Sequence, residues 1–259
     1  MATKGIGAAF LRAVDEGEVR LGRTPAQLFA TGAVGGIDVG VGVFALFIVT
    51  EQTGSHLLAS LFFTIGFIAL TLGRSELFTE NFLVPVAAVT AGKRQWPSVA
   101  RLWAGSLVGN LAGGFVIAAV VVTGFPQLER DAVDIGTHFT ELGIGWRSFA
   151  MALLAGVIIT LMTWMEHNHE STPGHIIAAV AAGWALAYGE LNHVIVASIE
   201  MFAALQFGAP FGYLDWLAVF GWAALGNMVG GLGLVTMLRL FQVQGGSAKE
   251  PDHDPEDND

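Results

Sequence analysis

Two clusters of polar residues interrupt the most apolar parts of the chain. The first, 73–81, contains Glu76 and Glu80, and the second, 189–193, ends in His193. An imidazole changes its charge near neutral pH, and burial or a neighbouring charge moves that transition. Inside a membrane an ionisable side chain is costly and is functional by default, although a satisfied structural histidine is the alternative. Glu76 and His193 are therefore candidate site residues.

A third cluster, Glu166-His167-Asn168-His169-Glu170, invites comparison with metal sites. It lacks the His-Glu-x-x-His spacing of zinc hydrolases, so we interpret it as the solvated polar end of a helix and predict no metal. The chain has no cysteine, which excludes disulfides and thiolate nucleophiles. No Gly-x-Ser-x-Gly motif supports a hydrolase. We predict that the protein is not an enzyme and has no cofactor.

The composition is that of an integral membrane protein. Hydrophobic residues make up 53% of the 259 residues and charged residues 13%, and the mean hydropathy is +0.60. Stretches with at most one charged residue, such as 25–50, which contains Asp38, and the uncharged 102–126 and 216–238, reach the roughly 20 residues that cross a hydrocarbon core. The lipid bilayer is therefore a partner of the chain, and nothing supports nucleic-acid binding.

The hydrophobic pattern predicts an all-α fold with six membrane crossings. The predicted crossings are 25–50, 56–91, 97–123, 146–166, 173–207 and 212–241. The second and the fifth are each about 35 residues long, too long for one simple span, and each has a polar cluster at its middle. A continuous helix facing lipid would not tolerate these clusters, so we expect both helices to be discontinuous.

The remaining segments determine the orientation. We expect an interfacial helix in 1–24, with Ile6, Phe10, Leu11 and Val14 on one face, an outer loop at 124–145, and a disordered acidic tail at 242–259. A cytoplasmic N-terminus places most basic residues inside, namely Lys4, Arg12, Arg20, Arg23, Lys93, Arg94, Arg101, Arg239 and Lys249. Both termini are then predicted to be cytoplasmic, in the inner (plasma) membrane, with Arg74 at membrane depth.

The two halves of the chain repeat. The segment that begins Gly109-Asn110 matches the segment that begins Gly226-Asn227, an offset of 117 residues (226 − 109), which also brings Glu76 onto His193. Three crossings per half, 25–123 and 146–241, require opposite insertion of the halves. Inverted repeats with a broken helix in each half indicate a transport site near the midplane. The positive ends of half-helices starting near Phe82 and Val194 would favour an anion there.

Other polar residues in the spans have two interpretations each. We interpret Asn110 and Asn227 as interhelical hydrogen-bonding residues rather than pore ligands. Arg74 could pair with Glu76 and Glu80 within one loop, or these groups could gate a pathway. Glu200 lies two helical turns beyond His193 and could either tune that histidine or contact a neighbouring helix.

At the two broken spans the chain resembles the formate/nitrite transporter family. The resemblance rests on Ser75-Glu76-Leu77-Phe78-Thr79, on His193 in the fifth span, on Trp164-Met165, and on the two Gly-Asn-x-x-Gly-Gly segments. It covers roughly residues 5–240. It implies an aquaporin-like six-helix protomer, a homopentamer with one pore per protomer, and passage of small monovalent anions such as formate, nitrite or hydrosulfide.

The resemblance also implies roles for single residues. Thr79 would face the pore histidine, His193, and apolar constrictions would flank the two. The candidates for the constrictions are Phe63, Phe67, Leu77, Phe78 and Leu186. Two positions depart from the family pattern, since many members have Glu where this chain has Asn192 and Asn where it has Ala197. The outer loop before the fourth crossing has no lysine, although members often carry a basic residue there, and His138 and Arg147 are the nearest substitutes.

Physical chemistry connects these residues to a mechanism. A bare anion loses its hydration in an apolar constriction, whereas a neutral acid crosses at far lower cost. We predict that a weak-acid anion takes or shares a proton of His193 while Thr79 donates a hydrogen bond, with Asn192 and Glu76 as further site residues. The alternative is a channel for an uncharged solute such as water, glycerol or ammonia. A purely structural role would predict no flux of any solute.

Overall fold

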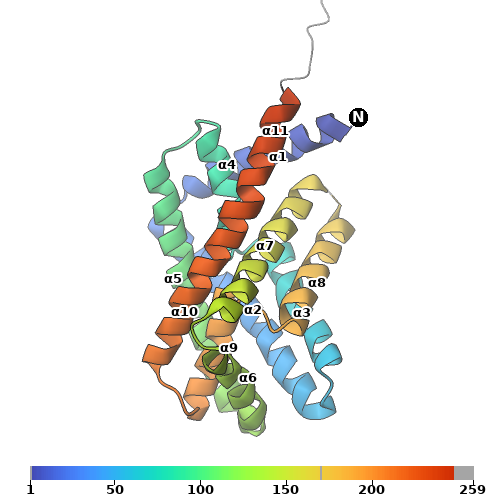
Figure 1. Ribbon diagram of the computed structural model, residues 1–259. Helices are drawn as coiled ribbons and strands as arrows, with labels where there is room; N and C mark the ends of the chain where they lie inside the picture. Colours follow the sequence, from blue (N-terminus) through green and yellow to red (C-terminus); the bar gives the residue numbers. More distant parts are fainter. Residues whose placement is uncertain (1, 170, 248–259) are drawn as a thin grey trace, which may run out of the picture.

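The computed structural model describes residues 2–169 and 171–247, which form a helical bundle without strands (Figure 1). Its elements in chain order are α1 (Ala2–Leu21), α2 (Pro25–Thr53), α3 (His56–Gly73), η1 (Glu80–Phe82), α4 (Val84–Thr90), α5 (Trp96–Gly124), η2 (Pro126–Leu128), α6 (Glu129–Leu142), α7 (Trp146–Asn168), α8 (Thr172–Tyr188), α9 (Val194–Phe207), α10 (Tyr213–Met228), the π-helical η3 (Val229–Thr236) and α11 (Met237–Ser247).

Five stretches of the described chain are long and apolar enough to cross a membrane. They are Pro25–Thr53, His56–Gly73, Trp96–Gly124, Trp146–Asn168 and Tyr213–Val243. The 17-residue α8 is also apolar. The predicted crossings 56–91 and 173–207 are each discontinuous, because α3 stops before α4 and α8 stops before α9. In Figure 1, α4 lies toward the end of the bundle that carries α1, and α9 toward the end that carries α6. We call these the α1 end and the α6 end.

Local sequence signals begin and end these helices. Thr24 and Gln27 form a capping box in front of Pro25, where the fixed φ of proline suits the first turn of α2. Gly54 ends α2 in the left-handed conformation, and the Ser55 side chain caps α3. The second helix of the hairpin therefore starts almost where the first one stops, which returns α3 alongside α2.

Glycines bring the paired helices into close contact in both halves. A Cβ on Gly113 would lie 2.0 Å from the Ala33 carbonyl oxygen, and a Cβ on Gly230 would lie 2.0 Å from that of Leu153. The α2–α5 and α7–α10 contacts are therefore equivalent, as inverted repeats require. However, Ala33 and Leu153 are 120 residues apart, so the single offset of 117 predicted for every span is wrong. Loops absorb such differences without changing the helix contacts.

Three peripheral predictions need correction. The predicted outer loop 124–145 contains α6, whose buried Ala132, Gly136 and Phe139 recur at helical spacing and pack toward α9. α11 continues to Ser247, into the predicted disordered tail, whose remainder, 248–259, lies outside the described residues. The polar composition of both segments concealed these helices.

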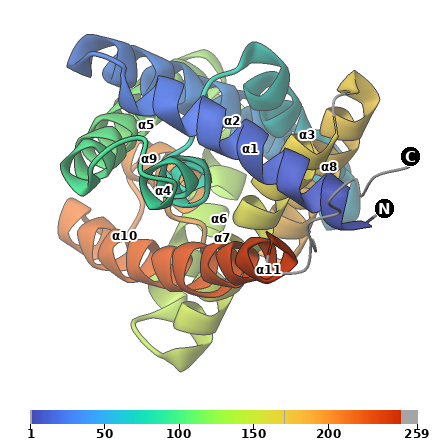
Figure 2. The ribbon, with the colours of Figure 1, turned by 90° about the horizontal axis from the view of Figure 1, so that it is seen from above.

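The predicted interfacial helix in 1–24 is α1. Figure 2 shows that it lies across the end of the bundle, near α4. Val14 is buried and Phe10 packs against the buried Leu83 and Trp164, whereas Leu11 is 61% exposed, so the four predicted residues do not all pack against the bundle. Leu11 lies at the edge of the predicted stripe, where the helix turns away from its neighbours.

Candidate functional site at the two helix breaks

The two breaks have the same backbone geometry. After α3, the Ser75 amide donates to the Leu70 carbonyl at 3.2 Å, and after α8, the Leu191 amide donates to the Leu186 carbonyl at 3.0 Å. The residues that precede these amides, Arg74 (φ 55°) and Glu190 (φ 47°), are the non-glycine residues with a left-handed backbone in the described chain. Both pairs are 116 residues apart, so the breaks are related by that offset.

Two buried asparagines hold the breaks. The Asn110 side chain accepts from the Phe78 amide at 2.8 Å and donates to the Glu76 and Gly32 carbonyls, both at 2.8 Å. The Glu76 carbonyl and the Phe78 amide lie in the break, where no helix satisfies them inside the membrane, and the contact with Gly32 ties the break to α2. The interpretation of Asn110 as an interhelical hydrogen-bonding residue is therefore confirmed.

Asn227 makes the equivalent contacts at the second break. It accepts from the Val194 amide at 2.9 Å and donates to the Ala152 carbonyl at 2.7 Å and the Asn192 carbonyl at 3.1 Å. Comparison of the two clamps pairs Asn192 with Glu76 and His193 with Leu77. The predicted equivalence of Glu76 and His193 is therefore wrong by one residue, because the chain between the break and its asparagine is one residue longer in the second half.

His193 and Thr79 meet at the centre of the bundle. The His193 Nε2 lies 2.8 Å from the Thr79 Oγ1, and both residues are 0% exposed. His193 is also the N-cap of α9, since its Nδ1 accepts from the Val196 amide at 3.3 Å. A neutral imidazole that accepts at Nδ1 carries its proton on Nε2, which then donates to Thr79. The Thr79 hydroxyl proton is left available for a solute.

The other two predicted site residues lie differently. Asn192 precedes His193, is 2% exposed, and its Oδ1 has no hydrogen-bond partner among the described residues. Glu76 is buried, and its carboxylate forms ion pairs with Arg20 of α1, at 3.1 Å, and with Arg23 in the connection between α1 and α2. The structure thus brings Thr79 and His193 together, keeps Asn192 beside them in the chain, and engages Glu76 elsewhere.

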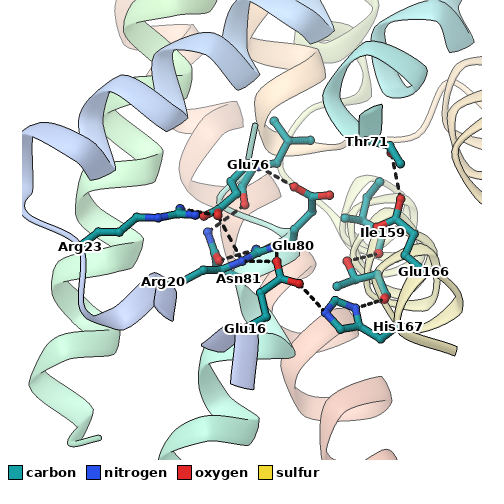
Figure 3. A network of polar contacts seen from close by, with 12 residues as sticks. Glu16, Arg20, Arg23, Thr71, Glu76, Glu80, Asn81, Ile159, Glu166 and His167 are labelled. Atoms are coloured by element: carbon teal, nitrogen blue, oxygen red, sulfur yellow. Dashed lines mark hydrogen bonds and ion pairs between the residues drawn. The ribbon is translucent and has the colours of Figure 1, made fainter. Parts of the chain in front are cut away.

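A network of charged groups fastens α1 to the first break (Figure 3). The Arg20 guanidinium bonds Glu16 and the Asn81 side chain, the latter at 3.0 Å, in addition to Glu76. Glu16 in turn lies 3.0 Å from the His167 Nε2 on α7. Burial would lower the pKa of Arg20, but Glu76, Glu16 and Glu80 outweigh burial and raise that pKa. Arg20 therefore stays charged at any physiological pH.

Glu16 is the acidic partner on α1 itself. Burial would raise the pKa of Glu16, but Arg20 and His167 outweigh burial and hold that pKa well below its ordinary value. Glu16 thus remains ionised and available to both partners. The network joins α1, α7 and the first break. In the sequence it is indicated only by Arg20 and Arg23, which lie three residues apart before the first crossing.

Two interpretations of polar clusters need correction. Arg74 is exposed and is not the partner of Glu76, whose ion pairs are with Arg20 and Arg23. The Glu80 carboxylate instead accepts a hydrogen bond from the Leu77 amide at 2.8 Å. His167 is buried in the network of α1 rather than solvated at a helix end. In the described part of the chain no three histidine, cysteine or carboxylate side chains are placed to hold a metal ion.

The five predicted constriction residues are all buried. Phe78 packs edge-on against Phe82, with ring centroids 5.0 Å apart. Phe63 and Phe67 form a tilted pair on α3, where Phe67 lies against Gly183 of α8. Leu77 lies within the first break, and Leu186 lines a cavity at the α6 end. The role of these residues as constrictions stays a prediction.

That cavity has a volume of about 230 Å³ and is lined by residues of α2, α3, α6, α8 and α9. Of the two predicted basic substitutes, His138 lines the cavity and Arg147, at the start of α7, does not. Glu200 also lines it, so its side chain faces the cavity, a position that neither of its two predicted contacts described. We call this space the α6-end cavity.

Comparison with known proteins identifies the family of the chain. A model of the family described as Formate/nitrite transporter matches residues 7–241. The chain is 28% identical over 243 residues to Inner membrane protein YfdC of Escherichia coli, which covers 88% of this chain and 76% of that protein. It is 26% identical over 148 residues to Formate channel FocA of Haemophilus influenzae, covering 51% of this chain and 52% of that protein.

Two solved structures share the fold. One, a pentameric formate channel with formate bound, has a TM-score of 0.72 at 20% identity and covers 85% of this chain and 98% of its own. The other, an FNT family ion channel, has a TM-score of 0.76 at 19% identity and covers 94% of this chain and 99% of its own. These matches confirm the predicted family resemblance and the all-α membrane fold.

Proposed function

We propose, on the premise that the chain belongs to the formate/nitrite transporter family, that it conducts small monovalent weak-acid anions, such as formate or nitrite, or their protonated forms. Membership of a transporter family also confirms that the protein is a transport protein and not an enzyme. The observation that carries the proposal is the buried hydrogen bond between His193 and Thr79, at the junction of two broken helices.

The contacts of His193 support a route for the proton. Its Nε2–H donates to Thr79, so the Thr79 hydroxyl can donate in turn to an anion held at this point. A proton shared along this chain lowers the charge of the solute before it enters the apolar surroundings, where a bare anion would lose its hydration. The N-terminus of α9 begins at Val194, directly after His193, and its partial positive charge favours the anion.

The assembly and the membrane orientation belong to the same proposal. We propose a homopentamer in the inner (plasma) membrane, with both termini cytoplasmic and one pore per protomer. The solved relative is described as pentameric. Large apolar side chains are exposed along the long helices, including Phe62, Ile65, Val116 and Val120, and such a surface requires lipid or another copy of the chain to cover it.

A channel for an uncharged solute remains the second candidate. It is favoured by the neutral hydrogen-bonding pattern of His193, whose two nitrogens are both engaged without a positive charge, and by the free Asn192 Oδ1. Water, glycerol or ammonia could exchange hydrogen bonds with these groups. Stopped-flow swelling of proteoliposomes would detect such a solute, and in this case the permeability would not follow the protonation of an acid.

The decisive experiment is uptake of formate, nitrite, hydrosulfide and lactate by proteoliposomes at two pH values. We expect flux above empty vesicles that rises at low pH. His193→Phe should abolish this flux, because it removes both hydrogen bonds of the imidazole while keeping a ring of similar shape. A His193→Phe protein that keeps wild-type formate and nitrite flux would contradict the proposal.

A further inference from the structure

Four titratable side chains face one another around the α6-end cavity. The Glu190 carboxylate lies between two imidazoles, with one oxygen 3.9 Å from the His56 Nε2 and the other 3.8 Å from the His138 Nε2. Glu200 lines the same cavity and is 5% exposed. These residues come from α3, α6, the second break and α9, so only the folded chain brings them together.

The backbone holds this arrangement in place. Glu190 keeps a left-handed backbone that a glycine would adopt more easily, and such strain is tolerated where the surroundings impose it. The His56 ring stacks on Tyr188 with ring centroids 5.2 Å apart, and its Nε2 lies 3.3 Å from the Ala187 carbonyl oxygen. The His138 Nε2 is buried and has no hydrogen-bond partner among the described residues. Its hydrogen-bonding capacity is therefore unused by the described residues.

The α6-end cavity borders the turn of α9 that follows the central histidine. Its wall includes Leu186, Leu191 and Val196. The Val196 amide donates to the His193 Nδ1 at 3.3 Å, so the cavity wall and the buried site share one turn of α9. A solute in the cavity is thus separated from His193 by a short apolar layer.

The neighbouring charges on the packed helices are mostly acidic. Neither lysine nor arginine is among the residues that line the cavity. On α6, Asp131 lies two turns before His138, and the exposed Glu141 follows it; Glu51 ends α2 near Asp131. Burial raises the pKa of Asp131, Arg130 opposes that shift, and Asp134 and Glu51 add to it. The surroundings therefore repel an anion unless the imidazoles carry charge.

We propose that the α6-end cavity binds the transported weak-acid anion when His56 and His138 are protonated, and that Glu190 excludes it when they are not. With neutral imidazoles and an ionised Glu190 these three groups carry one negative charge, and protonation of both imidazoles changes their sum to one positive charge. Imidazole is the side chain whose charge changes near neutral pH. This inference rests on the proposed function, because it assigns the site through which that substrate reaches His193.

The test compares uptake of radiolabelled formate into cells that express the full chain, at about pH 5.5 and about pH 8 outside. The fraction of protonated formic acid is the same for every variant at a given pH, so variant-to-wild-type ratios remove its effect. We expect His56→Gln/His138→Gln to match wild type at pH 8 and to lose roughly fivefold per missing charge at pH 5.5, from the attraction of one charge at contact distance in water. Glu190→Gln should raise uptake at pH 8 by a similar factor.

Matched controls lie away from the cavity. Glu129→Gln, in the exposed first turn of α6, and His169→Gln, exposed at the α1 end, should leave both ratios at one. Raising the salt concentration should shrink the effects of the cavity variants. Ratios for His56→Gln/His138→Gln that are equal at the two pH values would overturn this inference and leave the proposed function intact. Absence of formate flux in the wild type would instead overturn the proposed function together with it.

Discussion

The two helix breaks share a backbone frame and differ in the side chains that occupy it. In each, a helix ends at a left-handed residue, and one asparagine satisfies the exposed backbone groups. The first break then places Glu76 against Arg20 and Arg23, whereas the second places Asn192 at the equivalent position, followed by His193, with no ionic partner among the described residues. The two breaks thus share the backbone geometry, and the side chains that differ at the second break form the candidate site.

The largest difference between the breaks should appear when Glu76 is neutralised. Glu76→Gln leaves Arg20, which is buried, without one of its carboxylates, and breaking a buried ion pair costs about 3–5 kcal/mol. Asn192→Ala at the equivalent position should cost less, because its Oδ1 has no partner. Thermal unfolding in detergent would measure both. Equal losses would show that the first break does not depend on α1.

The asparagine clamps should respond alike. Asn110→Leu and Asn227→Leu each remove partners from one backbone amide and two carbonyls. A buried group left without a partner costs about 1–3 kcal/mol. We expect similar losses of folded protein on size-exclusion chromatography, and a large loss for one variant alone would contradict the equivalence of the breaks.

The contact between the breaks can be weakened without removing the histidine. Thr79→Val keeps the shape of the side chain and deletes the hydroxyl that His193 contacts, whereas Thr79→Ser keeps the hydroxyl. A hydrogen bond is worth about 0.5–1.5 kcal/mol, or roughly a twofold to tenfold effect on formate uptake. We expect Ser to retain flux and Val to lose it. Equal flux in both variants would exclude a role for the hydroxyl.

The smallest effect concerns the two left-handed residues. The left-handed conformation costs a non-glycine residue about 1–2 kcal/mol in the folded state. Substitution by glycine removes this strain, but glycine also has more conformational freedom in the unfolded state, which cancels part of the stabilisation. Arg74→Gly and Glu190→Gly should therefore raise the unfolding temperature slightly and equally, while Arg74→Val and Glu190→Val should lower it. If one glycine variant raised the unfolding temperature and the other lowered it, the two breaks would not be equivalent in backbone strain.

Much of the fold could be predicted from the sequence, because lipid imposes strong constraints. Apolar length determines where the chain crosses, and polar clusters inside those crossings require broken helices. The repeat could be recognised because both halves contain the segment Gly-Asn-x-x-Gly-Gly. Its glycines allow close helix packing, and its asparagine holds the helix break. The amphipathic α6 was missed, because its overall polar composition was interpreted as that of a loop although the buried Ala132, Gly136 and Phe139 recur on one face.

The sequence by itself determined the membrane class, the all-α fold, the two breaks and the choice of His193 as a candidate site residue. Only the tertiary structure decided which residues are equivalent and which meet: His193 corresponds to Leu77, Glu76 turns to Arg20 and Arg23, and His56 and His138 flank Glu190. The physical reason is that hydropathy depends on composition along the chain. A hydrogen bond or an ion pair depends on register to within one residue, and loops of different length shift that register without changing the hydropathy.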